Sequence, residues 1–187
     1  MAEQGTPLMA RQSLIGYNYS LLGNWPLEPV SPNPDYFTTL LFRRLVGRHL
    51  LVSSSSFPSP TSFDDMSGEA FRTFAFCGTQ GPGSVVVALV NFASHPLNFT
   101  FALTGDRDEY ILTPAGDTMP GYPFTSRLIA LNGDTLRVGE GGELPKMDPR
   151  VVRGDSPLRL EPLTVAFAGY TDPRFSEACQ LTNQFES

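Results

Sequence analysis

The sequence predicts a mainly β protein: an antiparallel β-sandwich preceded by one strand–helix unit. Glycine and proline are both abundant, with 17 of each in 187 residues, which is typical of short strands joined by turns. Polar and apolar residues alternate in Phe71–Phe76 and Leu97–Phe101, as they do in half-buried strands. A helical period appears only before Gly47, so the helix comes first and the strands follow.

The first unit is predicted from two neighbouring segments. Ser13–Tyr19 is a short apolar run closed by glycine and polar aromatic residues, which is typical of a buried parallel strand whose end opens onto a site. Asn33 is a suitable N-cap, Pro34 a suitable first helical residue and Gly47 a natural stop. The apolar side chains of this helix recur at helical spacing, at Phe37, Leu40, Leu41 and Leu45.

After Gly47 about seven strand-like segments follow one another, separated by turns. Leu131–Asp134 carries Asn-Gly between two apolar runs, which is a strong hairpin signal. The serine-rich stretch 53–69 is predicted to be a flexible surface loop.

The composition restricts the class of partner. Hydrophobic residues make up 41% and charged residues 17%, as in globular proteins with a core. The net charge of −6 provides no electrostatic surface for nucleic acid. No apolar run approaches the roughly 20 residues that span a bilayer, and residues 1–12 contain no apolar signal-peptide segment. These features favour a cytosolic chain.

Two other features favour export. Asn18 and Asn98 each begin an N-glycosylation acceptor triplet, although such triplets often arise by chance. Cys77 and Cys179 each lie next to a strand-like segment. From the pattern alone, they can form a bridge or remain two buried thiols.

The residues show no convincing catalytic or metal site. His49 and His95 are isolated and are interpreted as ordinary surface histidines, and no metal or cofactor is expected. Gly139–Glu143 precedes no helix, so it is interpreted as a turn rather than a phosphate loop. Most acidic residues fall in loops, so no catalytic pair of carboxylates is identified. These loop acids are Asp64, Asp65, Glu69, Asp106, Asp108, Asp117, Glu140, Glu143, Asp148 and Asp155.

Several blocks of the sequence resemble the C-terminal part of heparanase and heparanase-like proteins, the endo-β-glucuronidases of glycoside hydrolase family 79. The blocks are RQSLIGYNYSLL, PNPDYFTTLLFRRLVGRHLL, FRTFAFC, VVVALVNF, EYILTPAG, LIALNGDTLRV and LRLEPLTVAFAGY. They occur in the family's order and cover nearly the whole chain from about Arg11 onward.

The resemblance implies a fold and a site. It makes residues 1–48 the remnant of the last unit of a (β/α)8 barrel and residues 49–187 the C-terminal sandwich. Chemistry in such a barrel lies at the carboxyl ends of the strands. The family's matching residues line the substrate cleft, so Gly16, Asn18 and Tyr19 are the expected substrate-binding residues. Tyr17 replaces a residue that is usually small, and its ring could narrow the cleft.

The resemblance also implies what this chain lacks. The family's acid/base and nucleophile glutamates lie upstream of everything matched here. We therefore expect the chain alone to be inactive, as a truncated product or an incomplete gene model of a secreted enzyme. The barrel domain and a sandwich strand from the family's N-terminal part would be absent. The helix face of Phe37, Leu41 and Leu45 would then be uncovered. We expect the sandwich to be ordered from about His49 to Tyr170, and residues 1–48 to pack on it opportunistically or to associate with another chain.

For the cysteines, the resemblance favours a Cys77–Cys179 disulfide.

The resemblance also implies a binding partner and a location. The partner is a polysaccharide or proteoglycan glycan containing glucuronic acid, bound by the full-length enzyme. The implied location is extracellular, lysosomal or at a membrane surface or matrix. Two alternatives stay open. One is a non-catalytic β-sandwich that binds or scaffolds, and the other is a fragment without activity.

Overall fold

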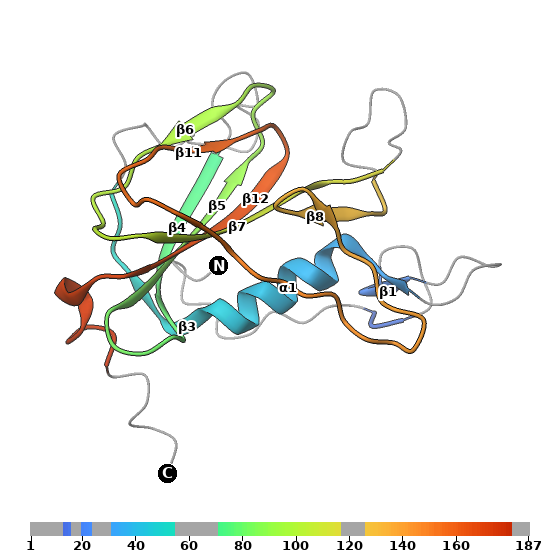
Figure 1. Ribbon diagram of the computed structural model, residues 1–187, viewed down its shortest axis with the longest axis horizontal. Helices are drawn as coiled ribbons and strands as arrows, with labels where there is room; N and C mark the ends of the chain where they lie inside the picture. Colours follow the sequence, from blue (N-terminus) through green and yellow to red (C-terminus); the bar gives the residue numbers. More distant parts are fainter. Residues whose placement is uncertain (1–12, 16–19, 24–30, 55–70, 117–125, 181–187) are drawn as a thin grey trace, which may run out of the picture.

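The computed structural model describes residues 13–15, 20–23, 31–54, 71–116 and 126–180. Within them, antiparallel strands form one large sheet (Figure 1). In sheet order these strands are β3 (Val46–Leu51), β4 (Phe71–Gly78), β5 (Ser84–Asn91), β12 (Thr164–Thr171), β7 (Arg107–Pro114), β8 (Ile129–Leu131) and β9 (Asp134–Thr135), with β10 (Arg150–Val152) also paired to β7. The mainly antiparallel β-sandwich predicted from the sequence is confirmed.

Smaller elements flank this sheet. Helix α1 (Pro34–Leu45) precedes β3, and β1 (Leu22–Gly23) pairs with β2 (Ser31–Pro32). Strands β6 (Leu97–Phe99) and β11 (Leu158–Leu160) form a separate two-stranded sheet, and a 3-10 helix spans Pro173–Phe175.

The central strands of the large sheet are apolar on both faces. Along β5, Val86 and Ala88 belong to one buried cluster, while Val87 and Leu89 belong to the other. Successive side chains of a strand point to opposite faces. Both faces of the sheet therefore need an apolar cover.

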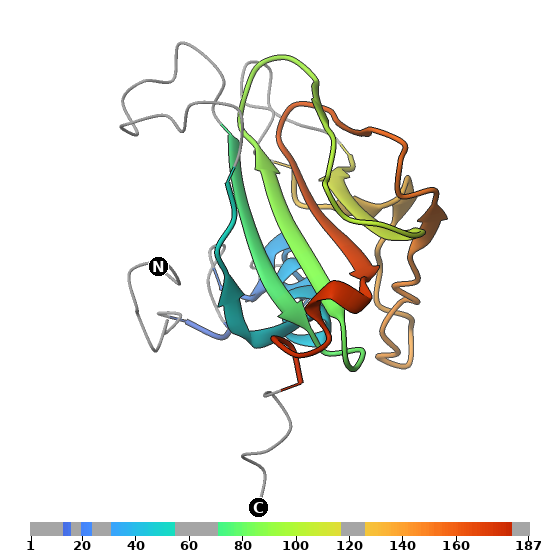
Figure 2. The same cartoon turned by 90° about the vertical axis from the view of Figure 1, so that its left-hand side faces the viewer.

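Helix α1 covers one face (Figures 1 and 2). The side chains of Phe37, Leu41 and Leu45 are 3%, 0% and 5% exposed and share a cluster with Tyr110 and Phe167. The prediction that this helix face is uncovered is therefore wrong. The sheet of this same chain buries these side chains.

The connection from α1 into the sheet explains this packing. The helix ends at Leu45 and β3 starts at the next residue, Val46, so no loop separates them. Because β3 is bonded to β4, the helix is directed back across the sheet. Gly47, predicted to stop the helix, instead lies within β3. A Cβ atom there would lie 2.8 Å from the Cys77 carbonyl oxygen, so the close approach of β4 requires glycine.

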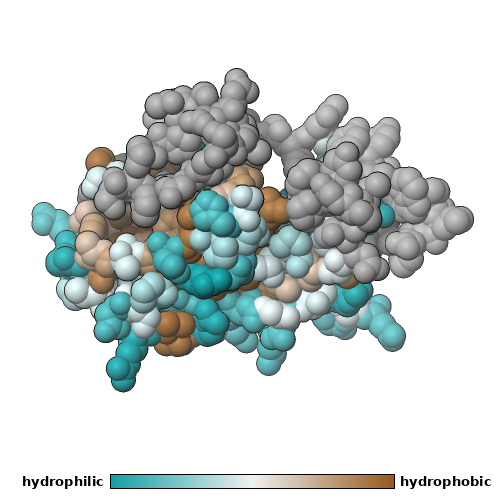
Figure 3. Space-filling view, turned by 90° about the horizontal axis from the view of Figure 1, so that it is seen from above, coloured by the Kyte–Doolittle hydropathy of each residue, from teal (hydrophilic) through white to brown (hydrophobic). Residues whose placement is uncertain are grey.

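The small β6–β11 sheet covers part of the opposite face. Phe99, Leu158 and Leu160 pack there with Phe71 and other residues of the second cluster. Within the described residues β6 pairs on one side only, with β11. A groove of about 420 Å³ runs along this region, lined mainly by apolar residues of β4, β5 and the 97–103 segment. Seen from above, apolar surface (brown) appears among hydrophilic residues (Figure 3).

Cys77 and Cys179 form the disulfide that the family resemblance favours. Their Cα atoms lie 5.3 Å apart and 102 positions separate them in the sequence. Closing a loop of this size is worth about 4–5 kcal/mol in the chain-entropy model. Both sulfurs are buried beside Val85, so the bond fixes the end of the described chain to the central strands.

The hairpin at Leu131–Asp134 is confirmed as the β8–β9 turn. Asn132 and Gly133 have φ angles of 51° and 98°, the left-handed conformation that Asn-Gly hairpin turns require.

The predicted strand Ser13–Tyr19 is only partly described. Its described residues, 13–15, form no strand, since Ile15 makes a single parallel bridge to Leu22. Leu14 and Ile15 are 63% and 51% exposed, because the described residues offer them no neighbouring parallel strand. Most of the predicted 53–69 loop lies outside the described residues. The division into residues 1–48 and 49–187 stays a prediction.

Candidate functional site

The residues predicted to bind substrate are not among those described. Gly16, Asn18 and Tyr19 lie outside the described residues, as does Tyr17, whose ring was predicted to narrow the cleft. The chain is described immediately before and after them, so the site is built from its flanking residues.

The two ends of this stretch are joined by hydrogen bonds. The Leu22 amide donates to the Leu14 carbonyl oxygen at 2.9 Å, and the Ser20 hydroxyl donates to the Ser13 hydroxyl oxygen at 3.0 Å. The Ser13 hydroxyl in turn donates to the carbonyl oxygen of Ile15 at 3.1 Å. Ser20 is fully buried. Residues 15 and 20 are therefore held close together.

Asn33 ties these ends to helix α1. It occupies the predicted N-cap position, but its side chain makes no capping hydrogen bond. Instead the Asn33 side-chain amide donates to the Ser20 carbonyl oxygen at 2.6 Å, and its backbone amide donates to the Leu21 carbonyl oxygen at 2.9 Å. A Cβ atom at Gly23 would lie 3.1 Å from the Asn33 amide group, so the packing is close. Ser20 and Leu21, which follow the candidate stretch, are thus attached to the start of α1.

A groove of about 780 Å³ begins at this point, at the end of α1 next to β1 in Figure 1. We call it the α1 groove. Its apolar base includes Phe37 and Leu136, which are 3% and 4% exposed and belong to the helix-side core. Arg127 and Arg137 also line it. The described residues that line it are Ser31, Pro32, Asn33, Phe37, Arg127, Leu128, Leu136, Arg137, Val138, Gly139, Glu140 and Gly142.

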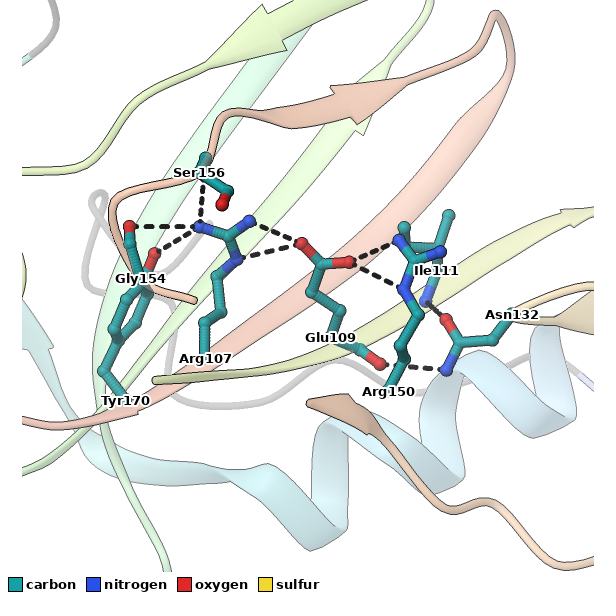
Figure 4. Close-up of polar contacts among 8 residues, drawn as sticks. All are labelled: Arg107, Glu109, Ile111, Asn132, Arg150, Gly154, Ser156 and Tyr170. Atoms are coloured by element: carbon teal, nitrogen blue, oxygen red, sulfur yellow. Dashed lines mark hydrogen bonds and ion pairs between the residues drawn. The ribbon is translucent and has the colours of Figure 1, made fainter. Parts of the chain in front are cut away.

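Glu109 is the buried acid that could resemble a catalytic carboxylate. It lies between two arginines (Figure 4). Arg107 donates to its Oε1 from Nε at 2.9 Å and from Nη2 at 2.6 Å. Arg150 donates to its Oε2 from Nε at 3.2 Å and from Nη2 at 2.5 Å. Both carboxylate oxygens are occupied, so Glu109 is a structural ion-pair residue.

The remaining donors of Arg107 are also satisfied. Its Nη1 donates to the Ser156 carbonyl oxygen at 2.8 Å, and to the Gly154 carbonyl and Tyr170 hydroxyl oxygens at 3.3 Å each. Burial alone lowers the pKa of Arg107, but the hydrogen bonds to Tyr170 and Glu109 outweigh it, so the pKa lies above its ordinary value. Burial raises the pKa of Tyr170 despite the neighbouring guanidinium. At neutral pH this network therefore contains a guanidinium and a neutral phenol.

Asn132 links the β8–β9 turn to the same strand. Its side-chain amide donates to the Glu109 carbonyl oxygen at 2.9 Å, and its Oδ1 accepts from the Ile111 amide at 3.0 Å. The hairpin residue thus completes the hydrogen bonding of β7 at the place where the ion pairs lie.

A second buried acid, Asp172, holds the C-terminal segment. Arg174 donates to it from Nε, Nη2 and its backbone amide, and the Thr104 amide donates to it as well. The Arg174 hydrogen bonds hold the pKa of Asp172 well below its ordinary value of about 4. This stabilisation is present above that value and is lost as the pH falls through the folded-state pKa.

Histidine and metal chemistry are not apparent in the described part of the chain. His49 and His95 are exposed, and the described residues contain no group of three or more His, Cys, Asp or Glu that could hold a metal ion. No described helix is long and apolar enough to cross a membrane.

The sequence reasoning missed both the Arg107–Glu109 pair and the α1 groove. A signal existed for the first, because positions 107 and 109 are two apart in a strand and share a face. The sequence contains no signal for the groove. Arg127 and Arg137 flank a hairpin, and only the folded chain brings them to the same groove as Asn33.

Comparison with curated proteins finds relatives that match most of this chain. Heparanase-like protein 3 of Arabidopsis thaliana is 29% identical over 186 residues, which cover 87% of this chain and 32% of that protein. Baicalin-beta-D-glucuronidase of Scutellaria baicalensis is 26% identical, covering 94% of this chain and 30% of the relative. Inactive heparanase-2 of Homo sapiens is 27% identical, and the match covers 89% of this chain and 28% of that protein. No protein-family model matches the chain.

The β-sandwich with its helix and these matches together show a similarity to glycosidases. The similarity is to heparanase-like proteins, and the matching part is their C-terminal region, as the sequence blocks indicated. The chain spans about a third of the length of the curated relatives it matches.

We predict that Glu109→Ala lowers the free energy of unfolding by about 3–5 kcal/mol, because it leaves Arg107 buried without its counter-ion. Urea denaturation measures this difference. Glu161→Ala is the matched control, since Glu161 pairs with Arg159 at an exposed position and should cost less than about 1 kcal/mol. Equal costs for the two variants would show that the buried network does not stabilise the fold.

Proposed function

We propose that this chain is the C-terminal part of a heparanase-like glycoside hydrolase that acts on glycans containing glucuronic acid. It supplies the sandwich and one wall of the substrate cleft. The observation that carries the proposal is the similarity over about nine-tenths of this chain to proteins that include one named as a β-D-glucuronidase. The glycan itself is a polysaccharide or proteoglycan chain.

The structural support is the position of the candidate stretch. Its ends are fixed to the first turn of α1 through Asn33, where a groove begins. Gly16, Asn18 and Tyr19 would contact the sugar from this stretch. The exposed Leu14 and Ile15 fit a strand that has barrel neighbours in the complete enzyme.

The glutamates that carry the chemistry would come from that barrel, which is the domain partner of this chain. A retaining enzyme needs two facing carboxyl groups about 5 Å apart. Among the described residues, the buried acids Glu109 and Asp172 each accept hydrogen bonds from arginine. Neither is placed to act as an acid/base group or a nucleophile.

The groove beside β6 has a role in the same proposal. It lies where the small sheet has an edge that no described strand pairs with, and its lining is mainly apolar. An additional sandwich strand from the enzyme's N-terminal part would fill it and complete the second layer.

A non-catalytic binding or scaffolding module is the second candidate function. One observation favours it, because a relative named inactive heparanase-2 matches this chain about as well as the named glucuronidase does. Stable, monomeric secretion of the chain by itself would support this alternative.

We predict that the purified chain does not hydrolyse nitrophenyl β-D-glucuronide above the blank rate, because its described residues provide no facing pair of buried carboxylates without arginine partners. In contrast, we expect baicalin hydrolysis by a chimera that joins this chain to the remaining part of the Scutellaria glucuronidase. The matched control is the same chimera with Asn18→Ala, which should lower kcat/KM at least tenfold. Turnover by the chain alone, or a monomeric chimera without activity, would contradict the proposal.

Export is part of this proposal, together with an extracellular, lysosomal or membrane-associated location. Asn98 is exposed on β6, and the Cys77–Cys179 bond suits an oxidising compartment. Asn18, the other acceptor, lies outside the described residues.

We predict that the chain carries an N-glycan at Asn98 when it is expressed through the secretory route. Mass spectrometry before and after enzymatic deglycosylation tests this, and Asn98→Gln should remove the mass difference. An unmodified Asn98 in secreted protein would contradict it.

A further inference from the structure

We propose that the α1 groove is a binding subsite for an acidic sugar, with Arg127 and Arg137 as the groups that recognise its carboxylate. This inference rests on the proposed function, because it names where an acidic glycan would continue beyond the candidate stretch. It concerns described residues only and can be tested on this chain alone.

The size and base of the groove suit a ligand. Its volume of about 780 Å³ falls in the range of small-molecule sites, which is about 300–1,000 Å³. Its base contains Phe37 and Leu136, whose side chains are packed into the helix-side core and cannot easily move. A sugar ring would therefore meet a rigid apolar surface below and polar groups at the sides.

The charge of the groove differs from that of the molecule. The chain as a whole carries a net charge of −6, yet the described residues that line this groove include two guanidinium groups and one carboxylate, Glu140. Within the described part of the chain, Arg137 makes no hydrogen bond or ion pair. A planar guanidinium presents donors that match both oxygens of a carboxylate. Glu140 can accept hydrogen bonds from sugar hydroxyl groups.

The wall formed by residues 139–143 is already ordered for binding. The Gly139 amide donates to the Glu143 carbonyl oxygen and the Gly142 amide to the Gly139 carbonyl oxygen, each at 2.9 Å. Gly142 has a φ angle of 87°, which a residue with a side chain adopts only with strain. This tight turn fixes the wall that follows Arg137.

The groove also continues from the candidate site. Asn33 lines it and donates to the carbonyl oxygen of Ser20, the residue that directly follows the stretch 16–19. The groove is therefore connected through Asn33 to Ser20, the first described residue after the candidate stretch.

The test is binding of an unsulfated oligosaccharide of alternating N-acetylglucosamine and glucuronic acid to the purified chain. The reference ligand is the same oligosaccharide with its carboxyl groups reduced to alcohols. We expect calorimetry or an NMR titration to show tighter binding of the acidic form. Arg127→Gln and Arg137→Gln should each weaken that binding about tenfold and remove most of the preference over the reduced form.

Arg159→Gln is the matched control, because Arg159 is an exposed arginine on β11 that does not line the groove. It should leave the affinity unchanged. All three arginines are exposed, so the variants should fold, and circular dichroism checks this.

The subsite is overturned if the acidic oligosaccharide does not bind, if the groove variants bind it as the unaltered chain does, or if Arg159→Gln weakens binding equally. None of these results depends on turnover. The proposed function fails separately, through an inactive monomeric chimera, so the two failures are distinguishable.

Discussion

The structure depends on the need to cover both faces of the central strands β5 and β12. These strands are buried from both sides, because apolar side chains alternate toward two separate clusters. A sheet with two apolar faces is stable only when each is removed from water. Helix α1 meets this need on one side, and the small β6–β11 sheet meets part of it on the other (Figures 1 and 2).

The same helix connects the fold to the proposed site. Its inner face contributes Phe37, Leu41 and Leu45 to the core, while Asn33 at its start holds the candidate stretch and lines the α1 groove. Because the core fixes the helix, it also fixes the position of the site relative to the sandwich. On the other face, the described residues leave a groove along β4 and β5, which we propose as the place of a further strand.

Much of the fold could be predicted from local patterns. The start of α1 at Asn33, the β8–β9 hairpin and the long strands β4, β5, β7 and β12 each have a signal within a few residues. The pairing of Cys77 with Cys179 could not be predicted from spacing, since 102 positions separate them; the family resemblance provided it. The end of α1 was predicted two residues late, because Gly47 serves a close strand contact rather than a cap.

What could not be predicted depends on the three-dimensional arrangement. The apolar stripe of α1 shows that the helix has a buried face, but not which partner buries it. The two arginines of the α1 groove belong to segments that flank a hairpin, and their proximity to Asn33 results only from the packing of α1 on the sheet. The residues 16–19 that the resemblance selects lie outside the described residues, so their role remains a proposal.

We infer that α1 and the large sheet form one cooperative unit. Native-state hydrogen exchange of Leu41→Ala tests it most directly, with Thr39→Ala on the exposed side of α1 as the control. We expect Leu41→Ala to lower the free energy of opening of the β5 and β12 amides by about 2–5 kcal/mol. This decrease should equal the loss in the global free energy of unfolding. Loss of protection confined to α1, with β5 and β12 unchanged, would contradict the claim.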